Sequence, residues 1–559
     1  MDFVLALHSH LPYVLNHGRW PHGSDWISEA AIDTYLPLLS ALRRLEVEDV
    51  PTPITIGITP ILANQLESPV FVTELEAYFA QRLKTCDESE TSLKTTGDSH
   101  LLPLAHYWKS HLLGLRALFR SVGGNLATAF RQLESEGRVE LISSGATHGF
   151  LPLLARDESI RLQLGLGRAE HRRIFGRDPD GLWLPECAYR PRGPWAPLPE
   201  APRRPMRRGI EEHVADAGFK YFFVDSHLAS AGHAFRLYGA EGGSVEDTEV
   251  RNSPYRAYRV ASARGATPVS AFVRDPLASR QVWSRQEGYP GDEWYLEFHK
   301  IRWPGGLKYW RVSAPGSDLG AKQPYDPSRA VERAGGHARH FVSLLNRIAA
   351  ERAAPAGSGR RPAEDVIAAP FDTELFGHWW HEGVDFLEQV YRSLKGDAAV
   401  HACTARDHLA HTPAGRGIHL TAGSWGANGD FSMWLNDETA WTWPRLWAIE
   451  ASFWDQAGDA LESPALQPVL AQAAREMLLA MGSDWQFIIS TGAVTDYAVK
   501  RFTEHCTEAE FLLSALAPGA PNLAAAQTRA EELWLQDHVF PNVLDAVRAA
   551  LSGSRSLAV

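Results

Sequence analysis

Two carboxylic acids stand directly after short apolar segments, where they could act as a pair. Glu186 follows Trp183-Leu184-Pro185, and Asp372 follows Val366–Phe371. Proline lacks a backbone N–H and suits the end of a strand. Cleavage of a glycosidic bond needs two carboxyl groups, one as nucleophile or base and the other as proton donor. Either acid alone would be interpreted as a salt-bridged residue, but the pair among Trp and His predicts glycoside chemistry.

Two histidines form a second candidate group near the N-terminus. His8 and His10 follow the apolar run Phe3–Leu7, and the alternation of side chains along a strand places both on one face. They could hydrogen-bond sugar hydroxyls, orient a carboxylate or bind a metal. A zinc site needs a third ligand, and His148 or Asp372 could supply it, so a metal centre stays open as the alternative.

Tryptophan is unusually frequent, with 19 residues against 5 methionines. Several lie beside Gly, Pro or Asp in segments that resemble loops, where a flat ring could stack on a sugar. Trp283, Trp425 and Trp434 are the candidates near glycine, and packing against neighbouring elements is an almost equally good interpretation of them.

The elements that must position these residues alternate between strands and helices. Short apolar runs are predicted as strands: 3–7, 54–58, 139–143, 182–184, 221–224, 269–273 and 366–371. Helical patterns between them include 29–45, 107–137, 158–175 and 327–352. About seven such units predict an α/β fold with an incomplete TIM-like (β/α)7 barrel. Most of the strands end in a polar or ionisable residue, as expected at the active-site face of a barrel.

The pattern also predicts how the chain is divided. The alternation of strands and helices is interrupted by a Pro- and Arg-rich segment after residue 191 and by a glycine-rich stretch at 232–243. Beyond about residue 440 the pattern is purely helical. We therefore predict a catalytic barrel at 1–191 and 249–421, a small inserted domain at 192–248, and a C-terminal helical domain at 422–559.

Composition excludes several other classes of function. The net charge is −12, without a long basic run, which argues against nucleic acid. We find no apolar stretch long enough to cross a membrane and no signal peptide, and four scattered cysteines suit a reducing compartment, so we expect a cytoplasmic protein. Dinucleotide, phosphate-loop and G-x-S-x-G motifs are lacking.

A set of motifs resembles glycoside hydrolase family 57, and within it the branching-enzyme group. These motifs are His-x-His-Leu-Pro at 8–12, Gly-Ile-Thr-Pro at 57–60, 183–189, 371–380, Trp-Gly at 425–426, 436–441 and Ser-Asp-Trp at 483–485. They span nearly the whole chain in order. The resemblance implies a (β/α)7 barrel, an insertion after the nucleophile strand, a helical C-terminal domain and a retaining mechanism without metal or organic cofactor.

The same resemblance suggests a role for individual residues. It implies that Glu186 is the nucleophile and Asp372 the general acid/base. It further implies a substrate site that comprises His8, His10, Trp26, His148, Trp283, His378, Trp425, Trp434 and Asp484. Tyr238 is the candidate for a tyrosine on a loop over the site. Phe371 and Gln486 depart from the residues common in the family, which slightly weakens the preference for branching over hydrolysis.

We therefore expect a 1,4-α-glucan branching enzyme that acts on amylose, amylopectin or glycogen. The first alternative is an α-amylase or 4-α-glucanotransferase of the same family, which would use the same carboxyl groups. A second is a metal-dependent polysaccharide deacetylase, whose strand ends also carry Asp and His. A third is a non-catalytic glycan-binding regulator.

Overall fold

A computed structural model describes most of the chain. The described residues are 1–19, 22–196, 205–230, 252–261, 267–284, 287–303, 305–314, 316–353 and 365–555. Tyr238 and much of the predicted insertion lie outside them. None of the helices in these ranges is both long and apolar enough to span a bilayer.

Seven parallel strands form the central barrel. They are β1 (Asp2–Ser9), β2 (Ile54–Ile58), β3 (Val139–Ser144), β4 (Gly181–Trp183), β7 (Tyr221–Val224), β9 (Val269–Val273) and β10 (Val366–Asp372). The order across the sheet is β10-β1-β2-β3-β4-β7-β9. In β1 and β10, His8 pairs with Asp372, so two predicted site residues lie side by side at the carboxyl ends of neighbouring strands.

The barrel is incomplete between its first and last strands in spatial order. Here β9 and β10 are joined by a single bridge between Arg274 and Ala368. The sheet extends past β9 instead, through antiparallel β8 (Tyr258–Val260) and then β12 (Gly417–Ile418). A short strand, β11 (His401–Ala402), pairs with the start of β1. The predicted incomplete (β/α)7 barrel is confirmed.

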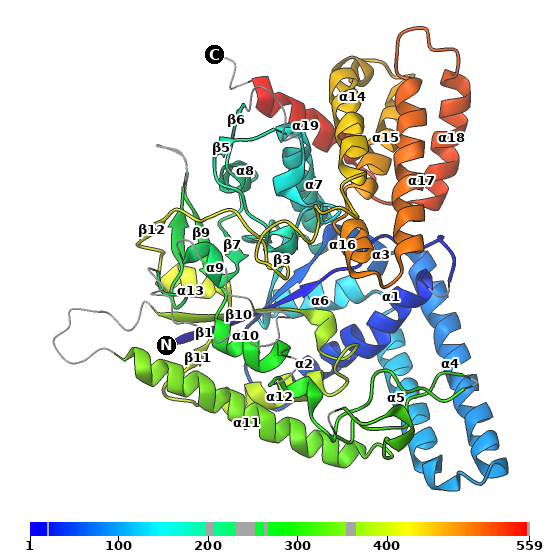
Figure 1. The fold of residues 1–559 in the computed structure, drawn as a ribbon, viewed down its shortest axis with the longest axis vertical. Helices are drawn as coiled ribbons and strands as arrows, with labels where there is room; N and C mark the ends of the chain where they lie inside the picture. Colours follow the sequence, from blue (N-terminus) through cyan, green and yellow to red (C-terminus); the bar gives the residue numbers. More distant parts are fainter. Residues whose placement is uncertain are drawn as a thin grey trace.

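Helices cover the outside of the barrel (Figure 1). Those between the strands are α1 (Ser24–Ala30), α2 (Leu36–Val47), α3 (Pro60–Leu66), α4 (Pro69–Thr95), α5 (Leu102–Ser121), α6 (Leu126–Ser135), α7 (Asp157–Phe175), α8 (Ile210–Asp216), α9 (Ser226–Ala229), α10 (Pro276–Trp283) and α11 (Pro327–Arg352). Two more, α12 (Gly383–Leu394) and α13 (Ala405–His411), follow β10. The strand pair β5 (Gly193–Pro194) and β6 (Met206–Arg207) stands apart from the main sheet.

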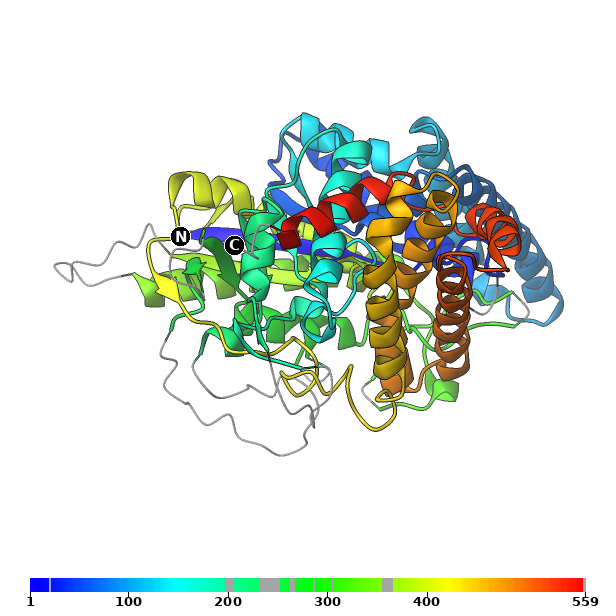
Figure 2. The same cartoon turned by 90° about the horizontal axis from the view of Figure 1, so that it is seen from above.

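The C-terminal part of the chain is helical. It comprises α14 (Thr442–Glu462), α15 (Gln467–Ala480), α16 (Asp484–Thr491), α17 (Thr495–Ser514), α18 (Leu523–Gln536) and α19 (Val543–Arg555). Both views place α14, α15 and α17 beside the barrel, on the side away from the N-terminus (Figures 1 and 2). Buried polar contacts join the two parts: Arg501 donates to the carbonyl of Tyr13, and Glu450 accepts from the amides of Ala155 and Arg156.

Two predicted helices are each broken in the structure. The predicted helix 107–137 is α5 and α6, separated at Gly123 and Gly124, which both have positive φ. The helical pattern at 522–551 also predicts a single helix, which the structure splits into α18 and α19. One domain boundary is also wrong, because β7 lies inside the predicted insertion 192–248 yet pairs with β4 and β9 in the main sheet.

Gly377 fixes the turn after Asp372. Its φ is 125°, and a Cβ there would lie 1.9 Å from the carbonyl oxygen of Asp33. We predict that Gly377→Ala destabilises the protein by about 1–3 kcal/mol more than Gly396→Ala, because only the first substitution adds a clash to the backbone strain. Gly396 also has positive φ (82°), but a Cβ added there would have nothing within 4 Å. Thermal or denaturant unfolding measures the difference, and equal losses would contradict the prediction.

Candidate active site

A cavity of about 430 Å³ opens at the carboxyl ends of the strands, where the barrel meets the C-terminal helices. The carboxyl groups of Glu186 and Asp372 both line it. The other lining residues are His8, His10, Leu11, Trp26, Ala30, His148, Arg274, Trp283, Glu374, His378, Trp379, Trp425, Gly426, Ala427, Met433, Trp434, Asp484, Phe487 and Ile488. Every predicted site residue that the structure describes therefore lines one cavity, and Tyr238 lies outside the described residues.

Glu186 is held in a turn just beyond β4. Its φ of 59° is in the left-handed region, which non-glycine residues seldom adopt, and Cys187 follows with φ 46°. Two donors fix the carboxylate: Trp425 Nε1 donates to Oε2 at 2.9 Å, and Ser483 Oγ donates to Oε1 at 2.7 Å. Strained backbone of this kind persists where surrounding contacts determine it, often at functional sites.

The same contacts set the ionisation of Glu186. Burial raises its pKa, while the hydrogen bonds from Ser483 and Trp425 favour the charged form and counter that rise. A carboxylate with two hydrogen-bond donors can remain ionised inside a protein, as a nucleophile must.

Asp372 has the opposite environment. Burial raises its pKa well above the usual range, and the nearby negative charges of Glu374 and Glu186 raise it further. The guanidinium of Arg274 acts the other way. A carboxyl group that keeps its proton near neutral pH can serve as a general acid.

Glu374 connects the Asp372 turn to two other elements. Its carboxylate accepts from the hydroxyl of Tyr35 and from the backbone N–H of His10 at 3.2 Å. Burial raises the pKa of Glu374 to about 7, against these hydrogen bonds. The charge next to Asp372 therefore changes within the ordinary working range of pH.

Three histidine rings stack beside Glu186. The ring of His8 lies 4.5 Å from that of Trp183 and almost parallel to it, and the rings of His10 and His148 are 4.0 Å apart. His8 and His148 share a hydrogen bond of 2.9 Å between their Nε2 atoms. Burial, and then the charge of His10, lowers the pKa of both well below the usual range, so both rings are neutral near pH 7.

The hydrogen bond from Ser483 to Glu186 fixes the order of donors in this group. The Ser483 hydroxyl donates to Glu186, so its oxygen accepts from Nδ1–H of the neutral His148 at 2.9 Å. His148 Nε2 then carries no proton and accepts from His8 Nε2–H. A chain of hydrogen bonds thus runs from β1 to the candidate nucleophile.

Of the three rings, His10 is the one whose surroundings favour a positive charge. Burial alone would lower its pKa, but Asp484, bonded to its Nε2 at 2.9 Å, and the charges of Glu186 and Glu374 raise it. The metal alternative for His8 and His10 finds no support here. A metal site needs at least three ligand atoms close together. Among the described residues, such groups occur only in places that do not include His8 or His10.

The aromatic residues divide into two kinds. Trp26, Trp283 and Trp425 are partly exposed at the cavity, as a sugar-stacking role requires. Trp434 reaches the cavity but is only 1% exposed and stacks on Phe150 at 4.5 Å, so the expectation of an exposed ring is wrong for this residue.

The rim of the cavity holds one predicted residue and one that was not predicted. His378 Nδ1 lies 3.2 Å from an oxygen of Asp33. Its neighbour Trp379 is 59% exposed, so this ring is open to a ligand.

Sequence reasoning missed Ser483, Glu374, Arg274 and Trp379. Three of them lie within motifs named above, and Arg274 follows the predicted strand 269–273, but the role of each depends on which neighbour it contacts. Arg274 comes directly after β9, and its guanidinium lies 3.2 Å from Asp225 and over the ring of Trp425. Its place at a strand end was the available signal.

A parallel barrel with two carboxyl groups in an aromatic-lined cavity defines the class of barrel enzymes that act on carbohydrates. The sequence model of glycosyl hydrolase family 57 matches residues 4–420. The chain belongs to this family. A second model, described as 1,4-alpha-glucan branching enzyme, C-terminal, matches residues 452–546.

Individual relatives agree with the family. A 1,4-alpha-glucan branching enzyme of Thermococcus kodakarensis is 40% identical over 509 residues, 90% of this chain and 72% of the relative. Its crystal structure matches with a TM-score of 0.87, covering 98% of this chain and 96% of that one. A probable branching enzyme of Mycobacterium tuberculosis is 33% identical over 95% and 96% of the two chains. The α-amylase AmyC of Thermotoga maritima is 27% identical, with a TM-score of 0.79 and 98% coverage of both chains.

Glu374→Gln should change the pH profile of the enzyme. The substitution removes a negative charge that raises the pKa of Asp372, so that pKa falls and the general acid loses its proton at lower pH. The basic limb of kcat/KM against pH, measured on amylose, is expected to move to lower pH.

Glu382→Gln is the matched control. Glu382 is also buried, with a pKa raised to about 7 by burial against a hydrogen bond from the Tyr325 hydroxyl, but it does not line the cavity. Its substitution should leave the profile in place. If the basic limb does not move in Glu374→Gln, the charge of Glu374 does not affect the pKa of Asp372.

Trp425→Phe should weaken catalysis through Glu186. Phenylalanine keeps an aromatic ring but loses the N–H that donates to Oε2, so the pKa of Glu186 rises and the acidic limb moves to higher pH. Loss of a hydrogen bond to a charged group corresponds to a fall of about 10- to 100-fold in kcat/KM. Trp454→Phe removes an indole hydrogen bond to Ser159 instead and should leave the profile unchanged. The same loss in both variants would point to general destabilisation.

Proposed function

We propose that this chain is a 1,4-α-glucan branching enzyme that cleaves α-1,4 linkages and transfers the released chain to a 6-hydroxyl. One observation carries this assignment. The segment 452–546, which matches the branching-enzyme C-terminal model, supplies Ser483 and Asp484, and these contact Glu186 and His10. The part of the chain that resembles branching enzymes is therefore part of the site itself.

In the first half of the reaction, Glu186 attacks the anomeric carbon of an α-1,4-linked glucose. Asp372 gives its proton to the leaving glycosidic oxygen, and the C–O bond breaks to leave a covalent glycosyl–enzyme ester. The donors on Glu186 favour its charged form before attack, whereas burial and the negative charges around Asp372 favour its protonated form. When Glu186 is neutralised as an ester, one of the charges that raise the pKa of Asp372 disappears.

In the second half, Asp372 is a carboxylate and removes the proton of the acceptor hydroxyl. For branching, the acceptor is the 6-hydroxyl of another glucan chain, which attacks the anomeric carbon and releases Glu186. Water in the same place gives hydrolysis. Two displacements retain the α configuration, and no cofactor enters the scheme.

The acceptor decides between branching and hydrolysis. Trp26, Trp283 and Trp379 offer open ring faces on which an acceptor chain can stack and exclude water. Amylose, amylopectin and glycogen are the proposed substrates. Tyr238 remains a candidate for a residue that covers the site. The α-amylase alternative keeps some support from the 27% identity to AmyC.

Two further features belong to this proposal. All four cysteines are buried free thiols, which fits a reducing cytoplasm, where glycogen is built. Apart from the corrected boundary at β7, we retain the proposed division into a barrel at 1–191 and 249–421, an insertion within 192–248 and a helical domain at 422–559.

Proton NMR of amylose incubated with the enzyme tests the function directly. We expect new α-1,6 anomeric signals with little gain in reducing ends. Glu186→Gln and Asp372→Asn should each lower the rate by at least about 10³-fold, because each removes a reacting group. Glu438→Gln, at an exposed acid outside the cavity, is the control and should keep full activity. Reducing ends without α-1,6 signals would identify an amylase, and full activity in either active-site variant would refute the assigned pair.

A further inference from the structure

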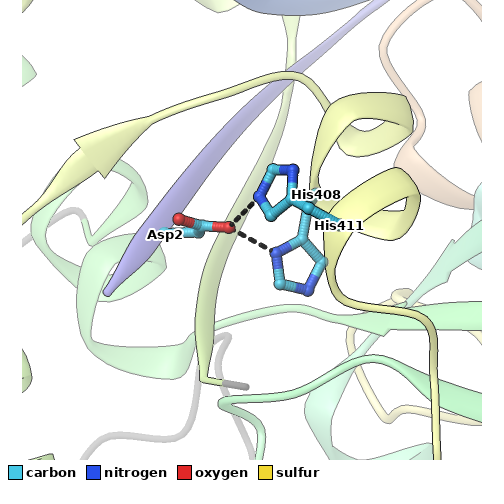
Figure 3. Close-up of side chains that lie close together, drawn as sticks. All are labelled: Asp2, His408 and His411. Atoms are coloured by element: carbon cyan, nitrogen blue, oxygen red, sulfur yellow. Dashed lines mark hydrogen bonds and ion pairs between the residues drawn. The ribbon is translucent and has the colours of Figure 1, made fainter. Parts of the chain in front are cut away.

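A group of metal-binding side chains lies at the end of the barrel opposite the cavity. Asp2 is the first residue of β1, whereas His8 near the end of the same strand lines the cavity. Six residues of a strand span about 20 Å, so the two places are well separated. Figure 3 shows one carboxylate oxygen of Asp2 facing two imidazole rings of α13, those of His408 and His411.

The three side chains converge on one point. An oxygen of Asp2 lies 2.7 Å from His408 Nδ1 and 3.1 Å from His411 Nε2, and all three atoms lie within 4.8 Å of one another. Ligand atoms on a tetrahedral ion with bonds of 2.0–2.1 Å are about 3.3 Å apart. The observed spacings need only small side-chain movements to accept such an ion.

Rigid contacts hold this geometry in place. Residues 408 and 411 are three apart on one helix and so share a face. The first turn of α13 is fixed to the barrel, because the Ala405 amide donates to Thr55 Oγ1 and the Arg406 amide donates to Glu140. The His408 side chain is fully buried beside the ring of Phe272, while His411 is about half exposed and provides a path for entry.

We propose that Asp2, His408 and His411 bind one divalent transition-metal ion of the zinc class, which fastens α13 to the start of β1. Two imidazole nitrogens and one carboxylate oxygen suit Zn²⁺ far better than Mg²⁺ or Ca²⁺, which prefer oxygen ligands. Water occupies the remaining position. This ion is structural and takes no part in glucan chemistry.

A second buried group is a poorer candidate. Glu476, His505 and Asp537 also bring their ligand atoms within 4.8 Å of one another. However, the Arg501 guanidinium lies 3.1 Å from His505, so a positive charge already balances these carboxylates. The Asp2 group has a half-exposed face. Among the described residues, the side chains that contact the Asp2 carboxylate are His401, Cys403, His408 and His411, and none of these is an arginine.

Metal titration of the untagged full chain, after dialysis against a chelator, tests the proposal. We expect one equivalent of Zn²⁺ to bind, and the visible spectrum of added Co²⁺ to show a four-coordinate site with nitrogen ligands. At a free Zn²⁺ concentration about 100 times Kd, Tm should rise by about 2–5 °C, because the ion binds only the folded chain. Amylose turnover below Tm should be the same with and without chelator.

Variants locate the site. His411→Ala, at a half-exposed position that should not disturb folding, and Asp2→Asn are each expected to weaken Zn²⁺ binding by at least about 10-fold and to abolish the Tm shift. His299→Ala is the matched control, because His299 also lies 3.1 Å from a carboxylate, that of Glu297, but without a third ligand among the described residues. It should bind Zn²⁺ as the unchanged chain does.

Three results would overturn the proposal. One is the lack of stoichiometric binding in the unchanged chain. Another is equal affinity in His411→Ala and the unchanged chain. The third is a loss of binding that follows His401→Ala or Cys403→Ser instead, since these two residues form a separate group with Asp2. The Co²⁺ spectrum keeps the test decisive if Asp2→Asn fails to fold, because His411→Ala alone should change it.

Discussion

Two carboxyl groups buried in one cavity must ionise differently, and this electrostatic requirement organises the site. Burial raises the pKa of both Glu186 and Asp372. The protein separates them through their neighbours. Hydrogen-bond donors from Trp425 and Ser483 stabilise the charge of Glu186, whereas Asp372 faces Glu374, whose charge opposes ionisation. The difference between the proposed nucleophile and the proposed acid therefore comes from the residues that surround the two carboxyl groups.

Those surrounding residues make the C-terminal helices part of the catalytic unit. Ser483 immediately precedes α16 and is 297 positions from Glu186 along the chain. His148, on the barrel, contacts the same hydroxyl, so barrel and helical part meet at one hydrogen-bond chain. A barrel without the helices would leave Glu186 with one donor fewer and His10 without the carboxylate of Asp484. The barrel and the C-terminal helices therefore both contribute side chains that position Glu186 and His10.

The sequence predicts well those features that depend on local pattern. β-branched and apolar runs located the seven strands, and parallel strands bring their carboxyl ends together, so Glu186, Asp372 and the histidines could be grouped before any coordinates. Features set by contacts between distant residues could not be predicted. A ring beside glycine can be partly exposed, as Trp425 is, or packed on Phe150, as Trp434 is, and the outcome depends on how the loop folds against its neighbours. Ser483 can donate to Glu186 only because α16, which it precedes, packs against the carboxyl ends of the barrel strands.

Strand β1 links the two ends of the barrel through simple alternation. Asp2, Val4, Ala6 and His8 occupy even positions and so share one face, and Val4 and Ala6 pack in the barrel interior. The neighbouring strand β10 repeats this order, with Val366 and Ala368 in the barrel interior and Asp372 at the cavity. A slip of one residue would turn every one of these side chains to the other face. Contacts that hold Asp2 at the start of β1 therefore also fix the register of His8 against Asp372, the proposed general acid.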